Sequence, residues 1–577
     1  MGGGGQPVGP GMFKAALADT PKEAFNWRLM ISVVCFGLMK PESLISSAKY
    51  SHQGAARGLD EGLIGTTVTQ KSFVSEYNLK VTKTFTKADL AEKTGNITAM
   101  VQIGSVGGAL IAFVFCDKIG RIWATRQLCV IWIIGVVVYI TAAGNYGQVL
   151  AGRFVMGLGI GQTTVVAPAY LAEIAPRSIR GLCICIFSGS VYLGIMLGYF
   201  ANWGTSLHIA NNTSKQWVDA TILHLVFAGI ILVMTCFSLE SPRWLVSIGK
   251  DEQATTNMCK LRQLPPDHPY VRSEMIDIHD QVDREKEATL GSGFFGPLKE
   301  LFMLPRNRYA ILLGLSCQLM GQWSGAQSIT IYAPQFFALL GTTGSSEKLF
   351  ATAIFGVVKF VSALICAFFL VDFLGRKRSL TIGIIIQLIS MLYIAIYLTA
   401  VPSISAGEVQ SKIAKHAGTG AIVFIYFSGV GWALGWNSIQ YLIGAEIFPL
   451  RVRSLGTSMI MCFHFVNQYG NSKAVPLMLI SGSPGLSPKG TFWLFVAVTI
   501  LGLVFVWFFL PETAGKSLEG MDEMFSLPWH VIGRKGAALT AGKGSVAEAI
   551  AMGDHEKADI MAREEQVEEA GERPAPV

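Results

Sequence analysis

Long apolar segments, separated by short polar loops, recur along the whole chain. A hydrocarbon core about 30 Å thick needs about 20 apolar residues per helix. The segments of that kind are Thr98–Phe115, Ala124–Ala143, Val149–Leu171, Leu182–Trp203, Trp217–Phe237, Tyr309–Leu340, Leu349–Val371, Leu380–Ala400, Gly418–Ile443, Ser454–Ile480 and Thr491–Leu510. A less regular candidate precedes them. The pattern therefore predicts an all-α membrane protein with twelve transmembrane helices.

Composition agrees with lipid as the surrounding solvent, because 51% of the residues are hydrophobic and only 15% are charged. Soluble proteins carry about 25% charged residues. The net charge of +7 is scattered over short basic clusters between segments, which argues against a nucleic-acid surface. When the irregular candidate is counted as the first segment, the clusters follow the second, fourth, eighth and tenth segments. The positive-inside rule therefore places those loops and both termini in the cytoplasm. We expect a multi-pass protein of the plasma membrane.

Three glycosylation sequons lie in segments predicted to be on the opposite side. Asn96 precedes the second segment, and Asn211 and Asn212 lie between the fifth and sixth. Acceptor asparagines face the secretory lumen, so these positions agree with the topology from the charges. We expect no structural disulfide, since the ten cysteines lie within or beside apolar segments or in a cytoplasmic loop.

The polar stretches divide the chain into five parts. They predict a cytoplasmic tail (1–25), a first six-helix bundle (26–239), a cytoplasmic linker with short helices (240–308), a second six-helix bundle (309–510) and a largely disordered cytoplasmic tail (511–577). The first helix is unusual, because the polar residues 39–53 interrupt it and joining Leu38 to Gly54 restores a regular segment. We interpret 39–53 as an insertion from a retained intron or an unusual isoform. The alternative is a genuine extra loop.

Two charged motifs occur once in each predicted bundle, in the same order. Asp117-Lys-Ile-Gly-Arg121 corresponds to Asp372-Phe-Leu-Gly-Arg376. Glu173 precedes Arg180 by the same spacing that separates Glu446 from Arg453. Repeats of this kind place a solute site between the two halves, near the midplane of the membrane.

These motifs resemble those of the sugar porter family of the major facilitator superfamily. Some stretches of the sequence are similar to those of the family's fungal quinate permeases. The resemblance includes Glu240-Ser-Pro-Arg-Trp-Leu245, Gln322-Trp-Ser-Gly325 and Pro511-Glu-Thr-Ala-Gly-Lys-Ser-Leu518. It implies two six-helix bundles, alternating access and proton coupling, with no cofactor beyond the proton gradient. It also implies gating salt bridges at the cytoplasmic face, formed by Asp117, Arg121, Glu173, Arg180, Asp372, Arg376, Glu446 and Arg453.

Asp60 is an ionisable residue in the first membrane segment, where a charge is expensive and functional by default. The resemblance implies that Asp60 and Arg153 form the proton-coupling pair. Glu61, beside Asp60, competes for that role. A carboxylate that is desolvated and then paired with a guanidinium can take up and release a proton.

The resemblance also implies a solute site built from both bundles. Paired amides suit hydroxyl groups, because each amide offers both a donor and an acceptor. The candidate solute-binding residues are Gln322, Gln327, Trp323, Tyr332, Ser188, Tyr441, His464, Asn467 and Lys359. The chain departs from the residues usual in the family at Ser188, at Tyr441 and in the sequence around His464. These departures put glucose specificity in doubt.

Lys359 lies inside an apolar segment. It is either a snorkelling or carboxylate-paired lysine, or a cation for an anionic solute.

From the motifs together we expect a transporter of a sugar or polyol, coupled to protons. The alternatives are a carrier of a cyclic polyol acid such as quinate and a nutrient sensor on the same fold. We expect no metal site and no enzyme, because the nine histidines form no ligand motif such as His-Glu-x-x-His. A monomer is the expected state.

Overall fold

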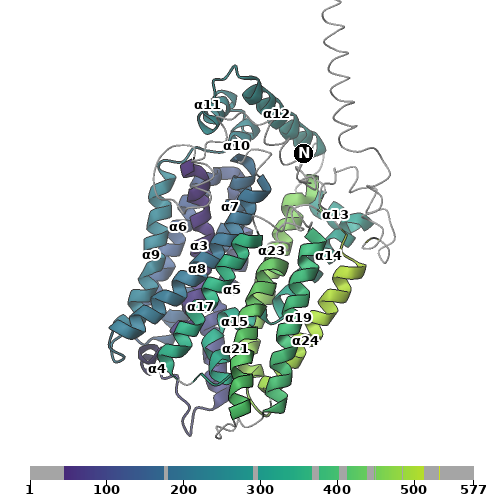
Figure 1. Ribbon diagram of the computed structural model, residues 1–577. Coiled ribbons are helices and arrows are strands. Elements are labelled where there is room, and N and C mark those ends of the chain that lie inside the picture. The colour runs from purple at the N-terminus through teal and green to yellow at the C-terminus, as the bar shows by residue number, and fades with distance from the viewer. Residues whose placement is uncertain are drawn as a thin grey trace, which may run out of the picture.

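The computed structural model describes residues 44–511 with gaps at 175–179, 290–295, 343, 367–375, 402–411, 438–446, 449 and 484, together with residue 532. Within these ranges the chain forms helices and turns without any strand. The long helices run side by side, and a smaller group of short helices lies across one end (Figure 1). The all-α prediction is confirmed.

The first bundle consists of long helices joined by short connections. Its helices are α3 (Leu44–Thr67), α5 (Lys87–Ile119), α6 (Arg121–Ile140), α7 (Tyr146–Ile174), α8 (Arg180–His208) and α9 (Lys215–Thr235), with the short α4 (Lys71–Glu76) at one end. Thr86 and Asp89 form a capping box that begins α5, because each side chain bonds the backbone N–H of the other.

Four short helices connect the two bundles. They are α10 (Pro242–Ser247), α11 (Asp251–Arg262), α12 (Pro269–Thr289) and α13 (Gly296–Met303). Arg262 fixes this layer to the first bundle, since it pairs with Glu274 at 2.6 Å and also donates to the carbonyl of Ile174. α10, α11 and α12 lie together beyond one end of the first bundle (Figure 1).

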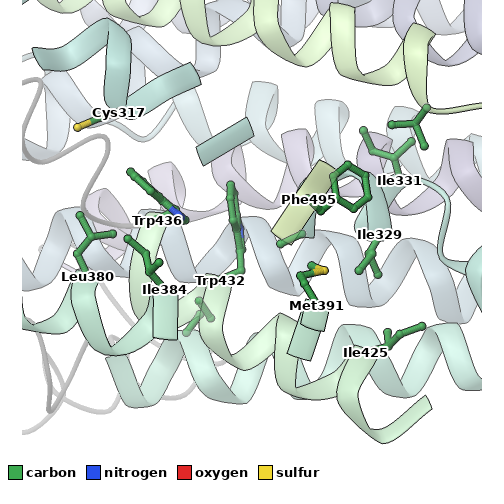
Figure 2. Close-up of a cluster of buried hydrophobic side chains, with 14 of the residues drawn as sticks. Cys317, Ile329, Ile331, Leu380, Ile384, Met391, Ile425, Trp432, Trp436 and Phe495 are labelled. Carbon is green, nitrogen blue, oxygen red and sulfur yellow. The ribbon is translucent and has the colours of Figure 1, made fainter. Parts of the chain in front are cut away.

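The second bundle contains interrupted helices. It consists of α14 (Pro305–Trp323), α15 (Ala326–Ile331), α16 (Ala333–Leu339), α17 (Ser345–Ile365), α19 (Arg376–Ala400), α21 (Lys412–Trp432) with the π-helical turn η3 (Ala433–Asn437), α23 (Leu450–Met478) and α24 (Ser487–Phe508). Its apolar core includes Trp432, Trp436 and Phe495 (Figure 2). The apolar segment Tyr309–Leu340 is thus not one helix but three.

Gly325 makes the break between α14 and α15. Its φ of +93° is left-handed, and an added Cβ would lie 2.5 Å from the Phe495 ring. A broken helix leaves carbonyls that must be bonded within the protein when no water is available. Asn471 donates to the carbonyl of Gln322, and Gln387 donates to that of Ser324. These bonds fix the backbone on which Gln322 and Gln327 stand.

Eight of the described helices are long and apolar enough to cross a membrane, namely α5, α6, α7, α9, α17, α19, α21 and α24. The long helices α3, α14 and α23 are more polar. On α3 the difference comes from Arg57, Asp60 and Glu61, all of which are buried. Polar residues therefore weaken the apolar signal where helices face the protein interior.

Small residues bring α3 and α8 into close contact. A Cβ on Gly58 would lie 1.7 Å from the carbonyl oxygen of Val191, and one on Gly194 would lie 1.9 Å from that of Ala55. Glycine at both positions lets the two backbones touch. The packing fixes the orientation of the charged turn of α3.

The polar interior has contacts between the bundles on both sides. α5 packs against α23, and α8 packs against α17. Toward one end, the hydroxyl of Tyr199 donates to the carbonyl of Thr330. Toward the other, Asn437 donates to Ser188 at 2.7 Å and Trp432 donates to Tyr192 at 2.6 Å.

Two features differ from the sequence expectations or extend them. The prediction that Asn96 lies in a loop is wrong, because it stands inside α5, where its sequon partner Thr98 is buried. Asn211 and Asn212 do lie in an exposed turn between α8 and α9. Residues 44–53 of the segment interpreted as an insertion form the first turns of α3, and residues 39–43 lie outside the described part of the chain.

Candidate functional site

Asp60 and Arg153 form a buried ion pair within the first bundle. Their oxygens and nitrogens are 3.1 and 3.4 Å apart in a two-point contact. Arg153 also donates from Nε to the carbonyl of Ile97 at 2.6 Å. The structure thus joins the two residues predicted to couple protons, and both side chains are almost fully buried.

His224 on α9 completes the surroundings of this pair. Its Nε2 lies 4.0 Å from Asp60 Oδ1, which is beyond hydrogen-bond distance. The ring of Trp132 packs edge-on against it. His224 was not predicted, because a single histidine in an apolar segment carries no distinguishing pattern.

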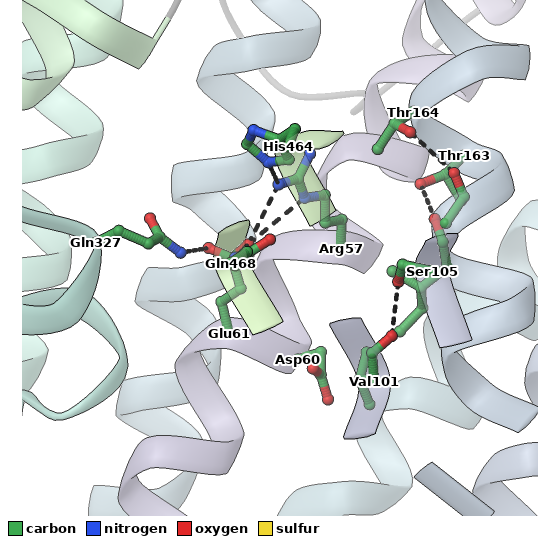
Figure 3. A network of polar contacts seen from close by, with 12 residues as sticks. Arg57, Asp60, Glu61, Val101, Ser105, Thr163, Thr164, Gln327, His464 and Gln468 are labelled. Carbon is green, nitrogen blue, oxygen red and sulfur yellow. Dashed lines mark hydrogen bonds and ion pairs between the residues drawn. The ribbon is translucent and has the colours of Figure 1, made fainter. Parts of the chain in front are cut away.

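Glu61 is the next residue along α3 but contacts the second bundle. One carboxylate oxygen accepts from Gln468 Nε2 at 2.8 Å, and the other accepts from Gln327 Nε2 at 3.2 Å. Arg57, one turn away, lies 3.5 Å from the first oxygen. Figure 3 shows Glu61 between these partners, with Asp60 turned away from them.

His464 on α23 links Arg57 to the amides of α14. Its Nε2 lies 2.8 Å from Arg57 Nη2, and its Nδ1 lies 2.8 Å from Gln318 Oε1. A guanidinium offers only donors, so Nε2 is the acceptor and Nδ1 carries the proton. The imidazole is therefore neutral here. Gln322 Nε2 lies 3.2 Å from the same Nδ1.

The predicted residues Trp323 and Tyr332 both form hydrogen bonds to α23. Trp323 donates to Asn467 at 3.2 Å, and Ser328 donates to Asn471 at 2.9 Å. The hydroxyl of Tyr332 donates to the carbonyl of Ser472. Gln468 and Asn471 were not predicted, although Gln468 directly follows the predicted Asn467 in the chain.

Lys359 is fully buried on α17 and surrounded by aromatic rings. Its ammonium lies 4.9 Å from the ring centre of Tyr192, 5.4 Å from Phe355 and 5.9 Å from Trp432. It donates to the hydroxyl of Thr330. The snorkelling interpretation is therefore wrong, because the ammonium points into the protein and stays there by cation–π and hydrogen-bond contacts.

Ser188 lies in the contact between α8 and η3, where its hydroxyl accepts from Asn437. Tyr441 lies outside the described residues. Of the predicted solute-binding residues, Gln322, Gln327, His464, Trp323 and Asn467 thus gather around one polar centre.

The gating residues can be followed in the first bundle. Arg121 pairs with Glu173 at 2.7 Å and with Asp117 at 3.0 Å. Arg376 is buried at the start of α19. Asp372 and Glu446, and the side chains of Arg180 and Arg453, lie outside what the structure describes.

Glu240 adds an unpredicted element to this group. Its carboxylate accepts from the backbone N–H groups of Arg121 and Ile122, both at 3.1 Å, and so caps the start of α6. Burial raises the pKa of the Glu240 carboxyl, while these backbone bonds, and one from Ser241, act to lower it. The cap ties the linker to the gating motif.

Comparison with known proteins identifies the family. The sequence model of the family described as "Sugar (and other) transporter" matches residues 50–525. The chain belongs to this family. Similar curated proteins include a probable quinate permease of Neosartorya fischeri, 31% identical over 88% of this chain and 89% of the relative. The quinate permease of Neurospora africana is 30% identical over 88% of this chain and 90% of the relative.

Solved structures of the proton:xylose symporter XylE share the fold. With 6-bromo-6-deoxy-D-glucose bound, XylE superposes with a TM-score of 0.68 at 22% identity, covering 84% of this chain and 99% of that one. Its inward open form from E. coli gives a TM-score of 0.63 at 21% identity, covering 83% and 98%. The predicted major facilitator fold is confirmed, and the protein is a multi-pass membrane transporter.

Proposed function

We propose that the protein carries a polyhydroxylated cyclic acid across the membrane together with a proton. The observation that carries the proposal is the charge of the centre. Among the described residues it holds three cations, Arg57, Arg153 and Lys359, and two carboxylates, Asp60 and Glu61, all buried. Three minus two leaves one positive charge. That excess attracts an anionic solute, because a charge without a counter-charge is costly at bilayer depth.

The amides of the centre suit the hydroxyls of such a solute. Gln322 Oε1 and Gln318 Nε2 are buried atoms without a hydrogen-bond partner in the described part of the chain. Buried polar atoms are normally bonded. A ring hydroxyl can accept from one amide and donate to the other, which makes both atoms candidates for solute contacts.

The Asp60–Arg153 pair supports proton coupling. Protonation of Asp60 removes the charge that holds Arg153, so the pair has one geometry with the proton and another without it. In alternating access, such a change shifts the balance between states that differ by a few kcal/mol. Proton binding at Asp60 and opening of the Arg121–Glu173 gate would then be linked through α7, which carries both Arg153 and Glu173.

The names of the relatives point to the same class of solute. Similar proteins over most of this chain are called quinate permeases. Quinate is a ring that carries hydroxyls and a carboxylate. Those groups correspond to the amides and the excess positive charge described above.

An uncharged sugar or polyol is the second candidate. The observation in its favour is that the two cations outside the Asp60–Arg153 pair already have partners, since Arg57 contacts Glu61 and Lys359 is enclosed by aromatic rings. The structural neighbour XylE is a xylose symporter, and one of its structures holds a glucose derivative. In this case, the amides alone would select the solute.

Uptake by cells that lack related transporters tests both candidates. Labelled quinate, glucose, xylose and inositol are supplied with and without a protonophore. We expect saturable quinate uptake that the protonophore abolishes. Uptake of a neutral sugar that excess quinate does not inhibit would overturn the acid in favour of the second candidate. Quinate uptake unaffected by the protonophore would overturn proton coupling.

We also propose the plasma membrane as the location, with both termini cytoplasmic, from the positions of the basic loops. A monomer is enough for this function, because one chain provides both bundles. Antibody access to terminal tags on intact and permeabilised cells tests the topology. Staining of either terminus without permeabilisation would contradict it.

A further inference from the structure

The carboxylate of Glu61 has the surroundings of a bound anionic ligand. Each oxygen receives its own amide N–H, from Gln468 at 2.8 Å and from Gln327 at 3.2 Å. The Arg57 guanidinium lies beside it. The side chain is 8% exposed, so these partners, and not water, satisfy its charge.

The amide donors belong to the other bundle. Gln327 lies in the first turn of α15, just beyond the break at Gly325, and Gln468 stands on α23. Both lie in the group of amides that gathers around His464. A side chain of the first bundle therefore occupies donors of the second bundle, at the place expected to bind solute.

A carboxylate on a solute would need the same donors. Amide N–H groups and a guanidinium are the side chains that hold a buried carboxylate with charge-assisted bonds. Two carboxylates cannot share them, because like charges at such distances repel strongly. Glu61 and the acid group of the solute are thus competitors for one set of partners.

We propose that Glu61 is an internal ligand, which holds Gln327, Gln468 and Arg57 until the carboxylate of the transported acid replaces it. Glu61 takes up one proton as it leaves these donors. This inference rests on the proposed function and adds a regulating residue to the same site. Asp60 remains the proton site within the first bundle, while Glu61 couples a proton directly to solute binding.

The proton follows from the surroundings of Glu61. Once its donors are taken, an ionised Glu61 would remain buried near a second anion, which is costly without partners. The titratable or charged groups that face it are Arg57 on α3, Tyr199 on α8, Lys359 on α17 and His464 on α23, whereas Asp60 is next to it in the chain but turns toward Arg153. Uptake of one proton offsets the charge of the incoming anion, and its release on the far side restores the ionised Glu61.

Binding to the purified full-length protein tests this inference. The affinity for labelled quinate is measured between pH 5.5 and 7.5 for the wild type, Glu61→Gln and Glu61→Asp, with inositol as a neutral probe. Glu76→Gln is the matched control, because Glu76 accepts from Trp217 outside the polar centre. Thermal unfolding of each variant checks that it is folded.

Glu61→Gln removes the competing charge. We expect it to bind quinate about tenfold more tightly than the wild type at pH 7.5 and with little pH dependence. Glu61→Asp, whose carboxylate reaches less far, should fall between the two. Glu76→Gln should match the wild type, and inositol affinity should change little in any variant.

Two results separate this inference from the proposed function. In the first, the wild type binds quinate, and folded Glu61→Gln binds it equally or more weakly with the same pH dependence. The proposal that Glu61 is an internal ligand is then wrong, while the proposed acid transport stands. If the wild type binds inositol or a sugar but no quinate, the proposed function fails and this inference fails with it.

Discussion

Asp60 and Glu61 are neighbours in the chain but belong to two different regions of the molecule. Asp60 turns toward Arg153 and His224, both in the first bundle. Glu61 turns toward Gln327 and Gln468, both in the second. Successive helix residues point about 100° apart. One turn of α3 thus carries two carboxylates with different contacts. Asp60 forms an ion pair within one bundle, and Glu61 belongs to a network between the bundles that must break when they move.

The difference suggests a division of tasks. A pair within one rigid bundle can keep a proton while the bundles move and release it on the other side, because its partners move together. A network between bundles can report whether solute is bound, since bundle movement separates its members.

Replacing Asp60 should have the largest effect. Asp60→Asn leaves Arg153 buried without its counter-charge, and breaking a buried pair costs about 3–5 kcal/mol. We expect loss of proton-driven accumulation in proteoliposomes with an imposed pH gradient, while quinate binding persists. Asp267→Asn, in an exposed ion pair of the linker, is the control. Normal accumulation by Asp60→Asn would remove the proton role from this pair.

Lys359→Met should have the next largest effect, and it should be selective. Methionine fits among Tyr192, Phe355 and Trp432 but lacks the positive charge. We expect KM for quinate to rise about tenfold, the effect of roughly 1.4 kcal/mol, with little change for a neutral sugar. An equal loss for both solutes would mean that Lys359 supports the structure and does not select the anion.

Gln468→Ala should give a moderate effect in the Glu61 region alone. Loss of one charge-assisted bond corresponds to about 1.5–3 kcal/mol before relaxation, and Gln327 still holds the carboxylate. We expect a severalfold change in quinate affinity, with proton-driven accumulation retained. Competition binding and accumulation are measured in the same preparation. Loss of accumulation with unchanged affinity would contradict the division between the regions.

His224→Gln should have the smallest effect. The 4.0 Å separation from Asp60 is too long for a hydrogen bond, so the pair with Arg153 is expected to hold Asp60 without the imidazole. Uptake should stay within about twofold of wild type across pH 5.5–7.5. A marked narrowing of the pH range would place His224 in the proton path.

The fold was largely predictable from the chain. Apolar segments of membrane length, the basic loops and the duplicated motifs fix twelve helices in two halves, because lipid permits few other structures. The break at Gly325 was not predicted, since a glycine within an apolar run is common in membrane helices. Only the contact with Phe495 and the amides that bond the freed carbonyls make it stable.

The candidate site was predicted in part. Asp60 and Lys359 are ionisable residues within membrane segments, so the cost of burial marks them directly, whereas Arg153 was predicted from the resemblance to sugar porters. Gln468, Asn471 and His224 are ordinary residues until distant helices bring them to a partner. Asn96 shows the opposite error, in which a residue was predicted to be exposed and lies inside a helix. A sequon is a local pattern of three residues, but its exposure depends on the tertiary structure.

The sequence by itself determined the membrane environment, the two-part architecture and the charges that must be buried. The tertiary structure decided which partner each charge has. That choice places Asp60 within one bundle and Glu61 between two. It depends on close packing of α3 against α8, which sets the rotation of one helical turn and so the direction of every side chain on it.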